Sequence, residues 1–273
     1  MADTTGLRAG SVRLPEVLFQ SITFMAPGIG IAFAIGIGIP LAGANLPLSL
    51  IIALVACSLT ALANGQLASR IPSAGGLYSY ARAAIGWRAG FTVGWYYLAV
   101  IFALTYFDVK LSVRTAMVLG GIEMLVFIAL GLTIVGHGPN SATPFNPSAS
   151  PDGASEIAQG AVYAVLAFIG FEAAASFGEE AKNPRRAVPL SIIASCVGVG
   201  LFYLFLSYAW NVGADSNIVA FHQAHGGNDW PAFAQRFWGG PGAWIVFLAL
   251  LNSIIAAGAS SAPPSPSWPS WCT

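Results

Sequence analysis

Two stretches of the chain combine helix-breaking residues with groups that could bind a small polar molecule. In the first, FQSITFMAPGIGIAFAIGIGIP (residues 19–40), Pro27, Gly28 and Gly30 lie in the middle of an apolar segment long enough to cross a bilayer. Proline removes a backbone donor and glycine weakens a helix, so the helix is predicted to break at mid-depth. Hydrocarbon cannot bond the freed groups, and a half-helix N-terminus attracts a carboxylate, so the break indicates a binding site. The alternative is a simple proline kink absorbed by neighbouring helices.

The second stretch, AFIGFEAAASFGEEAKNPRRAVP (residues 167–189), repeats this combination later in the chain. Gly170 lies between Phe168 and Phe171, and Glu172 follows them. A carboxylate at membrane depth costs about 2.5 to 3.5 kcal/mol on insertion scales, so it normally faces a cavity or a partner. Glu172 is therefore predicted either to serve a functional site or to accept hydrogen bonds from backbone amides freed at the break.

Two interrupted helices in separate halves of a chain are the pattern of an internally repeated transporter, whose half-helix ends converge near the midplane. Backbone N–H groups at the first break suit a carboxylate, and carbonyl groups at the second suit an ammonium group. The pair predicts a zwitterionic amino acid or a related amine as the substrate.

Other polar residues inside the apolar segments have two interpretations each. Glu123 is expected either to act in a proton relay or to pair with a neighbouring helix. Asn252 and Ser253 are expected either to hydrogen-bond across helices or to face a pore. An intramembrane enzyme would need paired ionisable groups or metal ligands at depth, and Glu123 and Glu172 have no His or Asp companions within the predicted spans. The sequence therefore favours a transporter over an enzyme.

Neither the histidines nor the cysteines predict a cofactor or a metal. The histidines fall in predicted loops, without the spacing of a zinc site: His137, His222 and His225. The cysteines are far apart and match no metal or redox motif: Cys57, Cys196 and Cys272.

The composition is that of an integral membrane protein. Hydrophobic residues make up 56% of the chain and charged residues 8%, against roughly 25% charged in soluble domains. The mean hydropathy is +0.71. The net charge is zero, which suggests no nucleic-acid partner. We expect an all-α transmembrane fold that forms a single domain over residues 1–258.

Seven apolar segments approach the roughly 20 residues needed for a transmembrane helix: 15–42, 46–68, 89–107, 115–135, 157–177, 188–210 and 242–258. The connector SRIPSAGGLYSYARAAIG (residues 69–86) is predicted to be an amphipathic segment at the inner face, with a gating role as the alternative.

The distribution of Lys and Arg predicts that one span is missing. Simple alternation of seven spans from a cytoplasmic N-terminus leaves six of these residues inside and five outside, which is almost no bias. If one crossing is absent between Arg88 and Lys110, ten lie inside and only Arg236 outside. Because cytoplasmic loops are rich in Lys and Arg, this second arrangement is favoured.

The last residues, GASSAPPSPSWPSWCT (258–273), have no helical period and no charge. We expect residues 259–273 to be an aberrant Pro/Ser/Trp-rich tail, produced by a shifted reading frame or a truncation.

Three motifs in this order resemble the amino acid permeases of the amino acid–polyamine–organocation superfamily: QSITFMAPGIGIAF, SRIPSAGGLYSYARAAIGWRAGF and FIGFEAAASFGEEAKNPRRAVPLSI. The resemblance covers roughly residues 14–257. It implies a core of five plus five inverted spans, leucine-transporter-like, whose first and sixth helices unwind around the substrate. It also implies secondary active transport across the plasma membrane by alternating access, coupled to a proton or to an exchanged amino acid.

The resemblance also assigns residues to the site. The substrate carboxylate would lie against the backbone of Ala26, Gly28, Ile29 and Gly30. The other half of the site would be formed by Phe168, Gly170, Phe171 and Glu172. Gln20, Ser21 and Asn252 are weaker neighbours.

Two departures from the family pattern lead us to expect a partial permease. Residues 108–135 resemble the family's fifth span but follow directly after the third, and the chain ends in the eighth. Some proton-coupled relatives have a lysine in the fifth span, and residues 115–135 contain none. We expect no uptake by the chain alone; the alternative function is a non-transporting membrane subunit or an inactive remnant.

Overall fold

The computed structural model describes residues 12–73, 75–105, 113–149, 153–215 and 217–261. The described part is a helical bundle with one isolated β-bridge, between Val12 and Ala181. Its α-helices are α1 Leu14–Phe24, α2 Pro27–Ile29, α3 Ile39–Ala42, α4 Leu46–Arg70, α5 Gly76–Ala84, α6 Trp87–Thr105, α7 Val113–His137, α8 Ala154–Leu166, α9 Pro184–Gly213, α10 Ile218–Ala224, α11 Asp229–Trp238 and α12 Gly240–Ser261. A π-helix covers Gly30–Ala34, and 3-10 helices cover Gly36–Gly38, Gly43–Asn45, Thr143–Phe145, Pro147–Ala149 and Phe171–Phe177.

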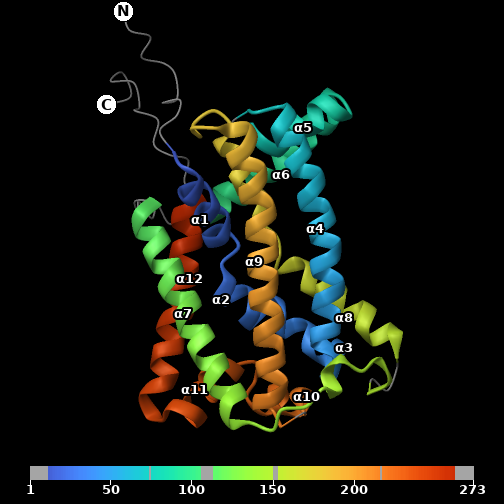
Figure 1. Ribbon diagram of the computed structural model, residues 1–273, viewed down its shortest axis with the longest axis vertical. Helices are drawn as coiled ribbons and strands as arrows, with labels where there is room; N and C mark the ends of the chain where they lie inside the picture. The colour runs from blue at the N-terminus through green and yellow to red at the C-terminus, as the bar shows by residue number, and fades with distance from the viewer. Residues whose placement is uncertain (1–11, 74, 106–112, 150–152, 216, 262–273) are drawn as a thin grey trace, which may run out of the picture.

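Helix α9 runs along the middle of the bundle, with α7 and α12 on one side and α4 and α8 on the other (Figure 1). Small residues allow the close packing of α4 and α9. A methyl group at Gly65 of α4 would lie 3.5 Å from the Pro189 Cβ of α9, and one at Gly200 of α9 would clash with Leu54 of α4. Without a hydrophobic driving force between helices in lipid, such small contact residues are how membrane helices approach one another.

The outside of the bundle is apolar, as a lipid-facing surface requires. Large side chains such as Ile37, Leu59, Leu125 and Leu248 are exposed. Five segments of the described residues are long and apolar enough to cross a membrane: Leu14–Arg70, Met117–His137, Ala154–Phe177, Pro184–Gly213 and Gly240–Gly258. The first segment contains two of the predicted spans, joined by the Gly43–Asn45 turn. This chain is therefore a multi-pass membrane protein.

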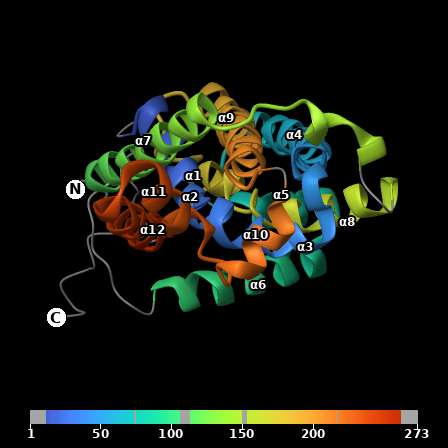
Figure 2. The same ribbon diagram turned by 90° about the horizontal axis from the view of Figure 1, so that it is seen from below.

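Helix α6, which covers most of the predicted span 89–107, lies across the bundle instead of along it (Figure 2). Residues 106–112 lie outside the described part of the chain. Helix α6 begins with exposed Trp87, Phe91, Trp95 and Tyr96. Aromatic residues of this kind favour the membrane interface, which gives a physical reason for a helix lying across the bundle near one end.

The segment between the predicted spans 188–210 and 242–258 is not an irregular loop, because it contains α10 and α11. His222 belongs to α10, and His137 is the last residue of α7, so the prediction that both lie in loops was wrong. Both new helices are short and partly polar. They pack at the end of the bundle and do not cross the membrane, so they need no long run of apolar residues. The hydropathy pattern therefore did not reveal them.

Candidate functional site

The first helix is interrupted where the sequence predicted. Helix α1 ends at Phe24, and Ala26 adopts a left-handed conformation with φ 46° and ψ 66° before Pro27 begins α2. The proline ring disfavours the right-handed helical conformation for the residue before it, which favours a departure from the helical path at Ala26. A π-helix and a 3-10 helix follow, so regular α-helix does not resume until Ile39.

Side chains from two other helices bond the N–H groups at this break. The Gly28 N–H donates to Glu123 Oε1 of α7, and the Ile29 N–H donates to Ser253 Oγ of α12 at 3.3 Å. Ser253 Oγ in turn donates to the same Glu123 oxygen at 2.7 Å. The break is therefore closed by a carboxylate and a hydroxyl that come from distant parts of the sequence.

Glu123 is fully buried, and its second oxygen, Oε2, has no hydrogen-bond partner among the residues that the structure describes. Of the two interpretations of this residue, the structure supports pairing with neighbouring helices. Sequence reasoning did not include Glu123 among the site residues. The available signal was an acidic residue inside an apolar span, but nothing in the sequence indicated which helix it would face.

The second helix is also interrupted at the predicted position. Helix α8 ends at Leu166, Gly170 has φ 115°, and a 3-10 helix begins at Phe171. The Gly170 N–H donates to Glu172 Oε2 at 3.0 Å. Of the two predicted roles of Glu172, the structure shows the bond to a freed backbone amide.

The two breaks touch one another inside the bundle. A methyl group at Gly170 would lie 3.2 Å from the Met25 nitrogen, and the Ala174 N–H donates to Ser21 Oγ at 2.8 Å. Tyr203 of α9 also links them. Its hydroxyl donates to the Ala167 carbonyl at 3.0 Å, and it lies so close to Gly30 that no side chain fits there.

The eight predicted site residues therefore belong to one packed region. Gly28, Gly30, Phe168, Gly170 and Phe171 are buried. Ala26, Ile29 and Glu172 are half-buried. The Phe168 ring packs edge to face on Tyr203, with ring centroids 5.6 Å apart.

The residues that were expected to lie beside the site form contacts within the protein. Ser21 joins the two breaks through Ala174, as described above, and Gln20 is buried. Asn252 Nδ2 donates to the Leu119 carbonyl at 2.7 Å, so its amide bonds across helices as the packing interpretation predicted.

The end of the bundle that carries α5 is closed by backbone packing. A methyl group at Gly178 would lie 2.5 Å from the Ser73 nitrogen, and the Val12 N–H donates to the Glu180 carbonyl at 3.2 Å. Burial raises the pKa of Tyr80 in α5 to about 12, so its phenol carries no charge at neutral pH. Burial and the neighbouring carboxylate of Glu179 also raise the pKa of Glu180.

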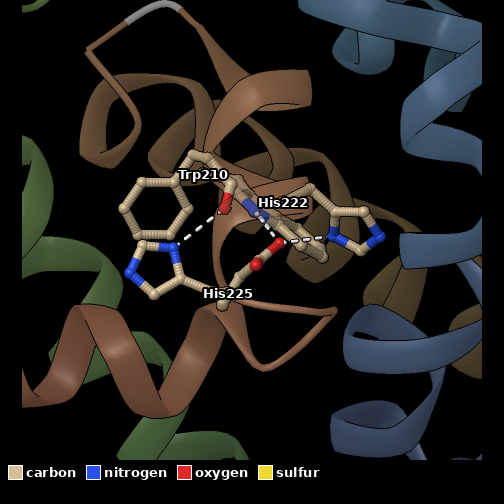
Figure 3. Close-up of polar contacts among 5 residues, drawn as sticks. Trp210, His222 and His225 are labelled. Carbon is tan, nitrogen blue, oxygen red and sulfur yellow. Dashed lines mark hydrogen bonds and ion pairs between the residues drawn. The ribbon is translucent and has the colours of Figure 1, made fainter.

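The opposite end carries a buried carboxylate cluster, shown in Figure 3. Asp229 Oδ2 lies 3.0 Å from Trp210 Nε1 and 2.7 Å from His222 Nδ1, whereas His225 bonds the Phe221 carbonyl separately. No group of His, Cys, Asp and Glu in the described residues has the arrangement of a metal site. This cluster ties α9, α10 and α11 together.

A multi-pass helical bundle with two interrupted helices that meet in its interior has the architecture of a membrane transporter. An amino acid permease family model matches residues 97–262, more than half of the chain, and a second amino acid permease model matches residues 16–109. The chain belongs to the amino acid permease family. This family membership points to a transporter rather than an enzyme. The two matches overlap at residues 97–109. This is the region where the charge distribution predicts a missing span.

Several curated proteins are similar to this chain. The branched-chain amino acid permease BcaP of Bacillus subtilis is 26% identical over 238 residues, which cover 66% of this chain and 50% of BcaP. The low-affinity putrescine importer PlaP of Escherichia coli is 25% identical over 239 residues, covering 72% and 53%. The mitochondrial cationic amino acid transporter 3 of Arabidopsis thaliana is 26% identical over 273 residues, covering 75% and 44%. The chain thus spans about half the length of these relatives.

Proposed function

We propose that this chain forms part of a secondary transporter that carries an amino acid or a related amine across the plasma membrane by alternating access. The observation that supports this proposal is the contact between the two helix breaks, through Ser21 and Ala174 and through Gly170 and Met25. Interrupted helices that converge inside a bundle are how such transporters surround a substrate. The names of the relatives are consistent with a substrate that is an amino acid or an amine.

Each break has a separate role in this proposal. The first would hold the substrate through backbone groups of Ala26, Gly28, Ile29 and Gly30. The second would surround the amine end with Phe168, Gly170, Phe171 and Glu172. Because the breaks are packed tightly against each other and against Tyr203, the substrate would enter only when one group of helices moves relative to the other.

Orientation and coupling complete the proposal. With the N-terminus in the cytoplasm and a missing span before α7, nearly all Lys and Arg residues lie on the inner side. The energy source would be a proton or an exchanged amino acid.

Ligand binding to the chain in lipid nanodiscs tests this proposal, because binding does not require a complete transport cycle. We expect saturable binding of at least one compound from a panel of amino acids and amines, measured by calorimetry. Gly30→Ala, which pushes a methyl group into the Tyr203 hydroxyl, should abolish binding, whereas Gly36→Ala should not, because its methyl group would lie 3.6 Å from Trp210. Since Gly30→Ala also disturbs packing, Glu172→Gln provides a milder variant, and we expect it to weaken binding of a ligand ammonium. Absence of binding by every compound, with the chain folded and monodisperse, would overturn the proposal.

A further inference from the structure

Aromatic side chains form a stripe along helix α6, which lies across the bundle (Figure 2). Trp87, Phe91 and Trp95 recur every fourth residue, so they share one face of the helix. Each of the three is at least 62% exposed, and the Phe91 and Trp95 rings are stacked with their centroids 6.4 Å apart. An exposed stripe of this kind suits the boundary between the headgroups and the acyl chains of a bilayer.

The adjacent face of α6 fixes this orientation by packing on α5. A methyl group at Gly90 would lie 2.7 Å from the Arg82 Cβ, and one at Gly94 would lie 2.9 Å from the Tyr78 ring. Small residues four positions apart let two helices approach this closely. Helix α5 is itself anchored to the bundle by Tyr80, which is buried. The two helices therefore form one hairpin, the α5–α6 hairpin, whose aromatic stripe faces outwards.

Positive charge surrounds the α5–α6 hairpin. Helix α4 ends and α9 begins at the same end of the bundle as α5 (Figure 1). The exposed cationic side chains of these segments are Arg70, Arg82, Arg88, Lys182, Arg185 and Arg186. The acidic residues within 70–105 and 178–186 are Glu179 and Glu180, and Glu180 is buried. Positive charge is therefore in excess on this surface.

The charges and the aromatic rings lie next to one another. The Arg88 guanidinium carbon is 5.7 Å from the centre of the Trp87 ring, and Arg82 Nη1 donates to the Tyr78 hydroxyl at 3.3 Å. Arginine presents several N–H donors that match the oxygens of a phosphate group. A lipid phosphate at Arg82 and Arg88 would therefore place its acyl chains against the aromatic stripe.

We propose that the α5–α6 hairpin, with the adjoining ends of α4 and α9, binds the headgroups of anionic phospholipids. Near an anionic membrane surface each Lys or Arg strengthens the attraction by roughly fivefold, whereas a zwitterionic phospholipid has no net charge to attract them. The aromatic stripe adds contact with the acyl chains of the same lipid. The inference concerns the outside of the bundle and goes beyond the proposed transport function, because no substrate takes part in it.

Native mass spectrometry of the unaltered chain tests this inference directly. The detergent-solubilised chain is titrated with phosphatidylglycerol and, separately, with phosphatidylcholine that has the same acyl chains. We expect phosphatidylglycerol to bind roughly tenfold more tightly, because only the headgroup charge differs between the two lipids. Glycerol 1-phosphate carries a phosphate group without acyl chains, so an excess of it should not displace the lipid.

Charge-removing variants test where the lipid binds. In Arg82→Gln combined with Arg88→Gln, the affinity for phosphatidylglycerol should fall roughly fivefold or more, while phosphatidylcholine binding and the elution volume stay unchanged. The control is Arg236→Gln, which removes a positive charge from α11 at the opposite end of the bundle. This control should leave both lipid affinities unchanged.

Fluorescence quenching locates the lipid without changing any charge. Phosphatidylcholine nanodiscs receive a small fraction of either phosphatidylglycerol or phosphatidylcholine that is brominated near the headgroup end of its acyl chains. We expect brominated phosphatidylglycerol to quench more strongly, and this excess to disappear in Trp87→Phe combined with Trp95→Phe, which keeps the rings aromatic. Trp244→Phe is the control, since Trp244 is 69% exposed near the start of α12, at the opposite end of the bundle.

The outcomes separate this inference from the proposed function. Equal affinities for the two lipids would overturn the inference, and so would displacement by glycerol 1-phosphate, which would indicate a site for free phosphate. A preference for phosphatidylglycerol that persists without Arg82 and Arg88, or excess quenching that persists without Trp87 and Trp95, would overturn the assignment to the α5–α6 hairpin. Each of these results would leave the transport proposal standing, because none of the measurements involves a substrate.

Discussion

At the first break the N–H groups of Gly28 and Ile29 are bonded by side chains of α7 and α12, whereas at the second break Gly170 is bonded by Glu172, only two residues further along. The N–H groups of Gly28 and Ile29 are therefore bonded through tertiary structure, whereas the Gly170 N–H is bonded within its own segment. A movement of α7 and α12 relative to α2 would free the donors of the first break and leave the second unchanged. This difference suggests that the first break is the one that changes its bonding when the bundle opens.

The largest expected effect comes from adding a methyl group at the first break. Gly30→Ala should lower the free energy of unfolding by roughly 3 to 5 kcal/mol, because the buried Tyr203 must move and lose its bond to Ala167. Urea unfolding in mixed micelles measures the loss. Gly36→Ala, in the same interrupted segment, makes only an ordinary contact and should stay within about 1 kcal/mol of the unaltered chain. Equal losses for the two variants would contradict the close contact with Tyr203.

A methyl group at the second break should have a smaller but clear effect. Gly170→Ala forces a side chain onto a backbone with φ 115° and towards Phe24, so we expect a loss of roughly 2 to 4 kcal/mol in the same unfolding experiment. Gly198→Ala in α9 is the control, because nothing lies within 4 Å of the added methyl group. A loss at Gly170 no larger than at Gly198 would show that the second break does not depend on this backbone conformation.

Removal of a bonding group from another helix tests how the first break is closed. Ser253→Ala leaves the Ile29 N–H without its acceptor and removes one hydrogen bond from Glu123, so it should cost about 1 to 2 kcal/mol. The control is Ser195→Ala, another fully buried serine, whose hydroxyl bonds the Ile192 carbonyl in its own helix. That variant should cost less than about 0.5 kcal/mol, since a helix carbonyl keeps its backbone partner. A larger loss of stability for Ser195→Ala than for Ser253→Ala would contradict the role of α12 in closing the first break.

The smallest effect on stability is expected at the acidic residue of the second break. Glu172→Gln should change the free energy of unfolding by less than about 0.5 kcal/mol, because the amide oxygen can still accept from the Gly170 N–H. Hydrogen exchange at Gly170 in the two proteins measures whether that bond remains. If Glu172→Gln lost more stability than Ser253→Ala, the second break would depend on its acidic residue more than the first break depends on α12.

The sequence predicted both breaks because their causes are local. Pro27 disfavours helical geometry at the residue before it, and Gly170 tolerates a positive φ that other residues resist. The apolar runs predicted the spans other than 89–107 for a similar reason, since lipid imposes length and hydrophobicity on each helix separately. The linker helices α10 and α11 were missed because their short, partly polar sequences carry no such requirement.

The sequence by itself determined that this is an all-helical membrane protein with helices interrupted near Pro27 and Gly170. It left two roles open for Glu172, and the structure shows the bond to the Gly170 N–H, two residues earlier in the chain. Only the tertiary structure decided that Glu123 and Ser253 close the first break, because the partners are 95 and 224 residues from Gly28 and Ile29 along the chain. The position of a residue in the sequence fixes the side of its own helix on which it lies. Only the packing of the bundle decides which backbone groups of other helices contact that side.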